Sequence, residues 1–387
     1  MKNQLTLIFF LILITIALAN EDIDLQVRLQ NQNQLTKDSI IDIFIERGNV
    51  KELFKVWHSI YKLNYDYNTE EGINRYRVFK ANLKKIQDHN RVNLDYKLGI
   101  NEYFDKTEKE LEVYFNIKER TPEEFRQSTK RFLVNLDDYD DSQENEPDPP
   151  QTNKNEPDPP QKKFAIDYTD DFSPIRDQGS CGSCYAFSTM GAIEGNYVVG
   201  NRIKGIKVNK VVLATQQLID CDYNPSSGGN WGCNGGWMRH ANDYLQLKQQ
   251  PMLENDYPYK AIQGTCAFNS DKVSPVKVSG YEKPLSANNG VFNVLINGPI
   301  SQCVNVQSTF FYYRSGLYNP KCTTSCNHAI VLMGWGVDPK GDYWLARNSW
   351  GSSWGIGGYF KVKDMGTSNC YSCLLAHDGY SMRPITN

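Results

Sequence analysis

The chain has 387 residues and a mass of 44.3 kDa, which is enough for one large domain and a smaller companion. Its formal net charge is -3 at pH 7 and it contains no basic run, so a nucleic-acid-binding function is disfavoured. Ten cysteines in a chain with an apolar N-terminal stretch are typical of an exported protein stabilised by disulfides.

The N-terminal segment predicts export. A largely apolar stretch from Leu5 to Ala19 follows Lys2 and ends in Ala17-Leu18-Ala19, which indicates a signal peptide over residues 1–19. An uncleaved anchor is the alternative, and the short length disfavours a stable one. The one Asn-x-Ser/Thr pattern, Asn224-Pro225-Ser226, is blocked for glycosylation by its proline. The secretory pathway is expected, with either a lysosome or vacuole or the extracellular space as destination.

Residues 20–135 read as a charged, helical region. Within it, six residues at spacings of three or four lie on one helix face, which predicts an amphipathic helix in a bundle with Phe54 to Ile60. They are Glu71, Arg75, Phe79, Asn82, Ile86 and Asn90.

Residues 136–163 change sharply in composition. The segment is acidic and proline-rich, and Asn-Glu-Pro-Asp-Pro-Pro-Gln occurs in it at Asn145 and again at Asn155. Prolines and like charges oppose a packed core, so we expect an extended, exposed linker that proteases can cut. We place processing near Lys162 or Lys163, which makes residues 164–387 the mature domain of about 220 residues.

The most informative motif is Gln178-Gly-Ser-Cys-Gly-Ser-Cys184-Tyr-Ala-Phe. After Cys184, apolar residues recur at helical spacing until Gly200, which is expected to end the helix. They are Ala186, Met190, Ile193 and Tyr197. The Cys184 sulfur would then lie at the positive end of a helix dipole, which favours the nucleophilic thiolate.

A histidine is the natural partner of such a thiolate, because its proton can be taken up and returned near neutral pH. His328 precedes an apolar strand expected over Ala329 to Trp335 and could also be an ordinary core histidine. The other four histidines suit the role less well: two precede the linker, and two lie outside any motif. They are His58, His89, His240 and His377.

These residues resemble the papain and cathepsin family of cysteine peptidases. The resemblance implies that Cys184 is the nucleophile and His328 the acid and base. Asn348, in Asn-Ser-Trp350-Gly, would orient the imidazole, with Trp350 shielding that pair from water. Gln178 would donate to the oxyanion of the tetrahedral intermediate together with the Cys184 backbone N–H.

The resemblance covers the chain from about Lys51 to the C-terminus. The face of the charged helix is similar to the inhibitory propeptide of cathepsin L-like zymogens, and Gly99-Ile-Asn-Glu-Tyr103-Phe-Asp105 is similar to a second propeptide motif, with Tyr103 where Phe is usual. It implies an α+β fold with a helical lobe and a β-barrel-like lobe, preceded by a helical propeptide that inhibits the enzyme. Strands are expected at Ala329 to Trp335, Asp342 to Asn348 and Tyr359 to Lys363.

The resemblance also implies substrate contacts. Gly235 and Gly236 would pair with the peptide backbone, although a simple turn explains them equally well. The pocket for the second side chain before the scissile bond would have no charged residue, so an apolar side chain is expected there. Its lining would be Trp237, Met238, Cys303, Cys326 and Ala329, with Leu375 a less certain floor.

Disulfide pairing follows only partly from the resemblance. It implies bridges from Cys181 to Cys233, from Cys221 to Cys266, and from Cys322 to Cys370 or Cys373. Cys303 and Cys326 either join across the pocket or line it as free thiols, and the sequence leaves both open.

The expected function is a cysteine endopeptidase made as a zymogen, acting as a monomer on proteins and peptides without a metal or cofactor. The mature region lacks the paired histidines of exopeptidase relatives. Three alternatives stand beside it. One is a catalytically silent binding protein of the same fold. The others are a zinc site, prompted by the C-x2-C pairs Cys181/Cys184 and Cys370/Cys373, and a thiol-disulfide oxidoreductase built on Cys181 and Cys184.

Overall fold

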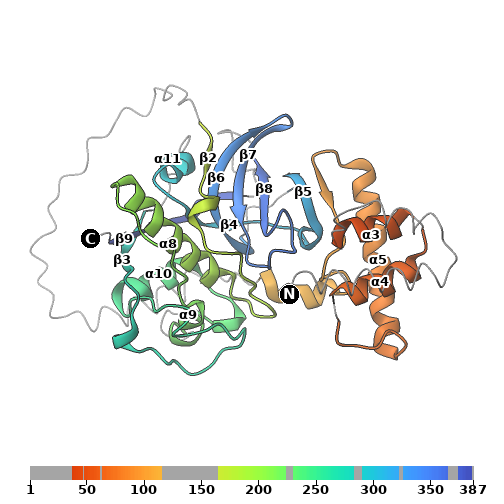
Figure 1. Ribbon diagram of the computed structural model, residues 1–387, viewed down its shortest axis with the longest axis horizontal. Coiled ribbons are helices and arrows are strands. Elements are labelled where there is room, and N and C mark those ends of the chain that lie inside the picture. Colours follow the sequence, from red (N-terminus) through yellow and green to blue (C-terminus); the bar gives the residue numbers. More distant parts are fainter. Residues whose placement is uncertain are drawn as a thin grey trace, which may run out of the picture. The chain divides into compact units, whose positions relative to one another are not determined.

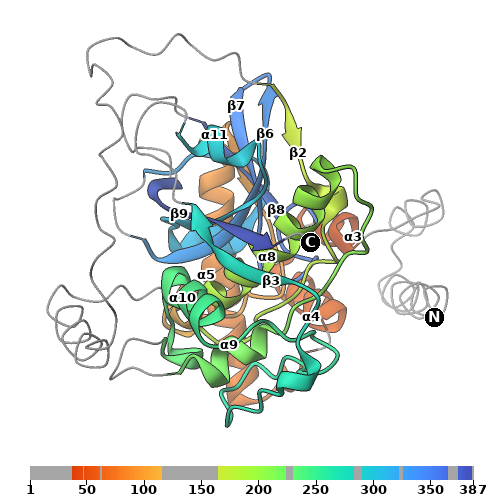
Figure 2. The ribbon, with the colours of Figure 1, turned by 90° about the vertical axis from the view of Figure 1, so that its left-hand side faces the viewer.

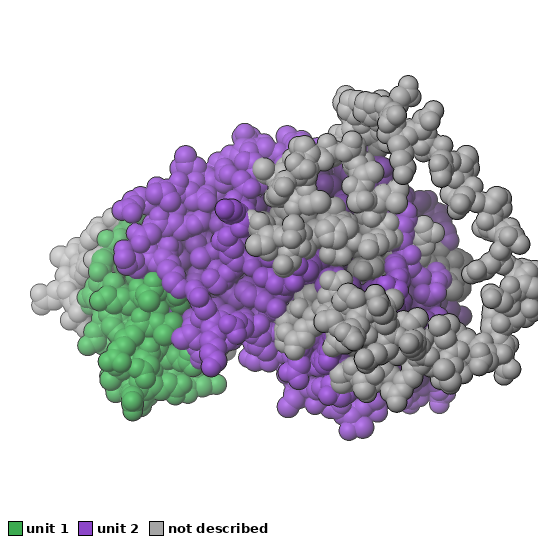
Figure 3. Space-filling view, turned by 180° about the vertical axis from the view of Figure 1, so that it is seen from behind, with its two compact units in different colours: residues 1–83 green, residues 84–387 purple. Residues whose placement is uncertain are grey.

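The structure is a computed structural model that describes residues 37–46, 48–61, 63–115, 164–223, 230–282, 290–321, 326–364 and 374–385. The expected signal peptide, the expected linker and the bridge from Cys322 to Cys370 or Cys373 lie outside these residues, as does the side chain of Leu375. The chain divides into two compact units, residues 1–83 and 84–387 (Figure 3), which we describe separately. No helix among the described residues is long and apolar enough to cross a membrane.

The first unit is helical. It contains α3 (Lys37–Glu46), α4 (Val50–Tyr61) and the first part of α5 (Glu70–Val92), which continues into the second unit. Aromatic rings hold α4 to α5, since the ring centroid of Phe79 lies 5.3 Å from that of Phe54 and 5.0 Å from that of Trp57. Phe79, Asn82 and Ile86 are buried on the helix face that the sequence pattern predicted.

The second unit is built on a sheet to which its described residues contribute nine strands, in the order β1-β5-β8-β7-β6-β4-β9-β3, with β2 paired to β6. Neighbouring strands are antiparallel except β5 and β8, which are parallel. The strands are β1 (Tyr96–Leu98), β2 (Ile166–Asp167), β3 (Lys277–Glu282), β4 (Ile300–Val304), β5 (Tyr313–Tyr318), β6 (His328–Asp338), β7 (Gly341–Arg347), β8 (Tyr359–Lys363) and β9 (Leu374–Ile385). The three strands expected from the sequence correspond to β6, β7 and β8.

Strand β1 comes from the segment before residue 116, so this segment extends the sheet of the C-terminal part through β5. A single turn of helix α6 (Glu108–Leu111) and the 3-10 helix η1 (Glu112–Phe115) follow it. Thr107 and Glu110 form a capping box at the start of α6, which fixes where this turn begins.

The helices of the C-terminal part gather beside the sheet. They are α8 (Cys184–Ile203), α9 (Thr215–Cys221), α10 (Met238–Leu247) and the short α11 (Gly290–Leu295). Helix α8 packs against β6 as well as α9 and α10 (Figures 1 and 2). Gly191 makes this packing close, because a Cβ there would lie 2.8 Å from Cγ2 of Val331.

The expected end of the long helix at Gly200 is wrong. Helix α8 continues to Ile203, and Gly205, with φ of 75°, follows its C-terminal residues. A glycine within a helix costs only about 1 kcal/mol, which tertiary packing can offset, whereas the left-handed backbone after the helix requires a residue such as glycine.

Candidate active site

Cys184 is the first residue of α8 and is fully buried. The helix is 20 residues long, and Ser183 at its N-cap makes no side-chain cap, so the positive end of the helix dipole is directed at this position. Among the described cysteines, Cys184 is the one outside a disulfide. The structure therefore keeps this sulfur as a thiol where a thiolate is electrostatically favoured.

His328 begins β6 and Asn348 follows the last residue of β7, so the sheet brings the two together. The distance from His328 Nε2 to Asn348 Oδ1 is 2.9 Å, and this oxygen also accepts from the backbone N–H of Ser349 at 2.9 Å. With Nε2 donating to Asn348, Nδ1 is left to exchange a proton with another group. Nδ1 has no hydrogen bond of good geometry among the described residues.

Trp350 covers this pair. Its ring centroid lies 4.8 Å from that of His328, the side chain is fully buried, and the ring of Phe311 stacks on it at 4.3 Å. Exclusion of water strengthens the hydrogen bond between His328 and Asn348. The structure thus places Trp350 against the imidazole of His328.

The side chain of Gln178 is held at both ends. Its Oε1 accepts from Ser349 Oγ at 2.7 Å and from Trp350 Nε1 at 3.1 Å, and its Nε2 donates to the backbone carbonyl of Cys181 at 2.9 Å. These bonds fix which end of the amide is the donor. The second hydrogen on Nε2 is the group that could stabilise an oxyanion.

Aromatic residues from the segment before residue 116 lie over this site. Phe115 packs its edge against His328 at a centroid distance of 5.8 Å, and it lies 5.6 Å from Trp350. Tyr103 and Tyr114 contact Trp350 at 6.2 and 6.1 Å. The site is therefore closed in this form of the chain.

Burial changes the acid–base property of the histidine. Burial lowers the pKa of His328 to about 4, whereas the hydrogen bond with Asn348 and the nearby backbone of Tyr114 act in the opposite direction. The imidazole is consequently held neutral at physiological pH in the closed form. A neutral ring cannot stabilise a thiolate as an imidazolium does.

A charged cluster that the sequence analysis did not identify lies behind the site. Glu194 on α8 forms an ion pair with Arg176 at 3.2 Å and accepts from the backbone N–H of Leu213 at 2.8 Å. Desolvation raises the pKa of Glu194, while Arg176 and Arg347 favour its charged form. The sequence did carry one signal for this cluster, because Glu194 is a lone carboxylate in the largely apolar middle of the helix.

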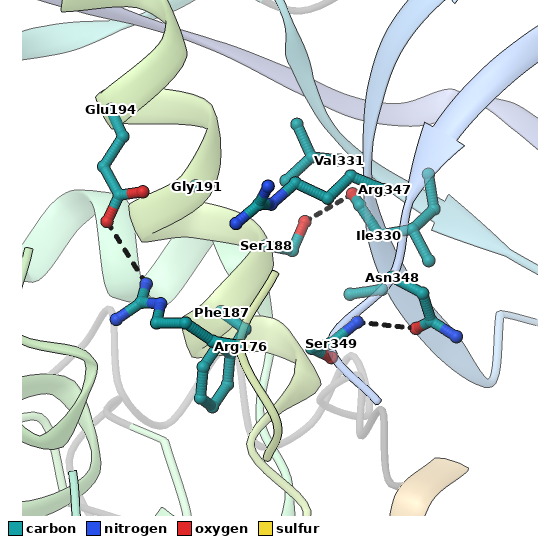
Figure 4. A pocket seen from close by; sticks show the side chains of 11 residues that line it. Arg176, Phe187, Ser188, Gly191, Glu194, Ile330, Val331, Arg347, Asn348 and Ser349 are labelled. Atoms are coloured by element: carbon teal, nitrogen blue, oxygen red, sulfur yellow. Dashed lines mark hydrogen bonds and ion pairs between the residues drawn. The ribbon is translucent and has the colours of Figure 1, made fainter. Parts of the chain in front are cut away.

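Figure 4 shows that this cluster borders a small cavity between α8 and the sheet, with about 20 Å³ of room for water. Arg176 lies two residues before Gln178, Glu194 shares α8 with Cys184, and Arg347 immediately precedes Asn348. Arg347 also donates to the carbonyls of Ser173 and Pro174 at 2.8 and 2.7 Å. The cluster thus links three of the four segments that carry the candidate catalytic groups, and the fourth is β6 with His328.

The expected substrate glycines have a structural requirement of their own. Gly235 has φ of 102°, which only glycine adopts readily, and a Cβ on Gly236 would lie 2.4 Å from Oδ1 of Asn230. That Asn230 oxygen accepts from the backbone N–H of Trp237 at 2.6 Å. Trp237 and Met238, at the start of α10, are both buried. The local turn is therefore enough to explain why both positions are glycine. A contact with substrate is not needed to account for them.

The cysteines pair in three bridges among the described residues: Cys181 with Cys233, Cys221 with Cys266, and Cys303 with Cys326. The third decides between the two possibilities that the sequence left open. Because Cys181 is bonded to Cys233, it cannot share a zinc ion or a redox disulfide with Cys184. Both alternatives based on that C-x2-C pair are thus disfavoured.

Comparison with known proteins identifies the class. Residues 162–380 match the family model described as papain family cysteine protease, and residues 54–111 match the cathepsin propeptide inhibitor domain. The chain belongs to the papain family of cysteine proteases and carries that family's propeptide inhibitor domain.

Individual relatives agree with this assignment. The chain is 34% identical to a probable cysteine protease RD21B of Arabidopsis thaliana over 84% of its own length and 64% of the relative. It is 33% identical to the KDEL-tailed cysteine endopeptidase CEP2 of the same plant, over 83% of the chain and 82% of the relative. The solved digestive procathepsin L 3 of Tenebrio molitor superposes with a TM-score of 0.66 and 28% identity, over 86% of this chain and 99% of the other. The expected papain-like α+β fold, preceded by a propeptide region, is confirmed.

Proposed function

We propose that this chain is the precursor of a cysteine endopeptidase in which Cys184 attacks the peptide carbonyl as a thiolate. His328 takes the thiol proton and returns it to the leaving amine, so that a thioester forms as the amide bond breaks. Water activated by His328 then hydrolyses the thioester and regenerates the thiol. Gln178 and the Cys184 backbone N–H stabilise the oxyanion in both steps.

One observation carries this proposal: His328 Nε2 lies 2.9 Å from Asn348 Oδ1 in a buried site that Trp350 covers. That bond selects the ring nitrogen that is available to the sulfur. A purely structural histidine would have no need of an orienting amide, a shielding indole and a helix that begins at a cysteine thiol. The combination supports catalysis more strongly than any one residue does.

The precursor is proposed to be inactive because its own N-terminal segment covers the catalytic groups and keeps His328 neutral. We propose a signal peptide at 1–19, a propeptide at 20–135, a linker with the processing site at 136–163 and a mature monomeric domain at 164–387. Passage through the secretory pathway to a lysosome, a vacuole or the exterior accords with this organisation.

Substrate preference is proposed to depend on an uncharged pocket. Trp237, Met238, Cys303 and Ala329 are all buried and Cys326 is half-buried, and none of them offers a charge to a substrate. An apolar side chain at the second position before the scissile bond is expected to be cleaved best. A panel of peptides that differ only there tests this expectation, and faster cleavage of the arginine peptide would refute it.

The decisive experiment for the function uses an epoxide that alkylates cysteine-peptidase thiolates. The acid-treated precursor, a Cys184→Ala variant and a Cys221→Ala/Cys266→Ala variant are each labelled and assayed for peptide hydrolysis. An endopeptidase is expected to take up the label on Cys184 and to hydrolyse the peptide, and Cys184→Ala to do neither. If the treated wild-type protein binds peptide but takes up no label, a catalytically silent binding protein is supported instead.

A further inference from the structure

The segment that ends helix α8 carries positive charge that the catalytic proposal does not use. Between Glu194 and Asp220 the sequence has no acidic residue, although the net charge of the whole chain is -3. Four basic residues are spread over nine positions of this segment, and all four are exposed. They are Arg202, Lys204, Lys207 and Lys210. The end of α8 and the residues after it therefore form a basic surface.

The turn at the end of α8 gives this surface a defined backbone. The N–H of Ile206 donates to the carbonyl of Asn201 at 2.9 Å, and the N–H of Gly205 donates to the carbonyl of Arg202 at 2.9 Å. With the left-handed backbone at Gly205, these two bonds make a Schellman motif. The motif leaves Ile203 63% exposed and Ile206 42% exposed. We call the two isoleucines and the lysines at 204, 207 and 210 the basic corner.

Helix electrostatics explains only part of this charge. Arg202 and Lys204 lie at the C-terminal end of α8, where the helix dipole favours cations, and Arg202 also forms an ion pair with Asp171 at 2.7 Å. Lys207 and Lys210 follow the last turn, where the effect of the dipole has fallen off. Neither of them forms an ion pair with another residue that the structure describes. The charge of these two lysines is thus available to a partner.

The linker expected at 136–163 has the opposite charge. It contains nine acidic and three basic residues. Four of the acidic residues are close together in Leu136-Asp-Asp-Tyr139-Asp-Asp141, where Leu136 and Tyr139 add apolar side chains. The basic corner offers the complement of this stretch, with lysines for the aspartates and isoleucines for the apolar side chains.

The linker is also joined to the chain close to the basic corner. It ends at residue 163, and Asp171, the ion-pair partner of Arg202, is only eight residues further on. Eight residues span at most about 28 Å, so the linker begins within that distance of the end of α8. A short tether of this kind gives an effective concentration in the mM range. An affinity of about 1 mM is then enough to keep a contact formed roughly half of the time.

We propose that the basic corner is a docking surface for the acidic linker of the same chain, with the aspartates of residues 137–141 as its principal ligands. This interaction goes beyond the proposed peptidase function and does not depend on it. In the precursor the contact holds the linker against the domain at 164–387. Cleavage near Lys162 or Lys163 cuts the short tether, so the contact weakens and the basic corner becomes accessible in the mature enzyme. Because the attraction is between exposed charges, salt weakens it.

The test measures how fast Lys207 and Lys210 are acetylated in a Cys184→Ala precursor, in which the linker stays intact. A matched precursor keeps the length of the linker but carries asparagine in place of the aspartates at 137, 138, 140 and 141. At low salt both lysines should be acetylated roughly twofold more slowly with the aspartates present, as half occupancy requires. Lys248, which is exposed just after α10, is the internal control and should react equally in both proteins. About 1 M NaCl should abolish the difference, because the Debye length falls to about 3 Å.

A reciprocal measurement follows the linker. Lys204→Gln/Lys207→Gln/Lys210→Gln changes only exposed positions and should let added trypsin cleave after Lys154 about twofold faster, since cleavage follows the population of the undocked linker. Lys248→Gln should leave that rate unchanged.

Equal acetylation of Lys207 and Lys210 in the two precursors would overturn the proposal, as would protection that extends to Lys248 or persists in about 1 M NaCl, or an unchanged rate of cleavage after Lys154. If vesicles of phosphatidylserine and phosphatidylcholine slow the acetylation while the linker substitutions do not alter it, the basic corner is a membrane-binding surface instead. No arm requires hydrolytic activity. Failure here therefore leaves the peptidase function untouched, and that function is refuted separately by a lack of epoxide label on Cys184.

Discussion

The phenyl ring of Phe115 meets the imidazole of His328 edge to face, with ring centroids 5.8 Å apart and planes at 75°. The two residues are more than 200 positions apart in the sequence. One belongs to the segment before residue 116 and the other to the candidate catalytic group. This contact places an aromatic ring of the segment before residue 116 directly against the imidazole of the candidate acid–base residue.

The first prediction concerns that contact. Phe115→Ala should make Cys184 in the uncleaved precursor roughly tenfold more reactive toward the epoxide at pH 7. Loss of a half-buried aromatic ring costs about 1.5 kcal/mol of docking free energy, less than for a fully buried one. The rate of label incorporation is the measurement. Glu112→Ala, which changes an exposed residue of the same 3-10 helix, serves as control, and equal rates in the two variants would contradict the prediction.

The second prediction concerns pH. In the closed precursor the pKa of His328 is about 4, against an ordinary value of 6.5. Between these values the unfolded chain binds a proton that the closed form excludes, so the free energy of unfolding falls as the pH falls from 6.5 to 4. The loss attributable to this residue is at most about 3 kcal/mol.

The measurement is the urea midpoint of a Cys184→Ala precursor at pH 7, 5.5 and 4, with and without His328→Gln. The difference between the two proteins isolates His328 from other groups, such as His89, whose pKa is also lowered by burial. Below this window the free energy of unfolding is expected to fall again, as Asp95 and Glu108 become protonated. Hydrogen bonds from Asn319 to Asp95 and from Lys85 to Glu108 lower the pKa of each carboxyl group. Parallel pH curves for the two proteins would show that His328 is not buried as a neutral ring.

The third prediction concerns the oxyanion. Gln178→Ala in the mature enzyme should reduce kcat by about 100-fold with little change in KM, since an oxyanion donor acts mainly in the transition state. Gln217→Ala removes another buried glutamine amide, one on α9 that donates to the backbone carbonyl of Gln250. It should leave kcat unchanged. A fall in kcat of similar size in both variants would indicate a general structural effect instead.

The fourth prediction concerns the buried charge cluster. Glu194→Gln should lower the free energy of unfolding by about 3 kcal/mol, because the half-buried Arg176 and the buried Arg347 lose their counter-charge. Asp243→Asn is the control, since it removes the partly exposed pair with Arg239 at 3.7 Å and should cost less than about 1 kcal/mol. Chemical denaturation of both mature variants is the measurement, and equal costs would mean that the cluster contributes little.

Local sequence patterns predicted most of the elements near the site. The spacing after Cys184 predicted α8, and alternating and apolar runs predicted β6, β7 and β8, because helices and strands differ in the period of their buried residues. The end of α8 was misplaced at Gly200, since the sequence does not show whether packing compensates a glycine inside a helix. The amphipathic face of α5 was also predicted, because residues at helical spacing lie on one side of a helix and that side is the one that packs.

The sequence by itself determined which candidate groups this protein has for its chemistry. They are a cysteine that begins a helix, a histidine before an apolar strand, and the side-chain amides of Asn348 and Gln178. Only the tertiary structure decided which partners those groups meet. The Arg176–Glu194–Arg347 cluster, the Cys303–Cys326 bridge and the ring of Phe115 over His328 join residues far apart in the chain. Such contacts depend on how helices and strands pack in three dimensions, and no local period in a sequence encodes that packing.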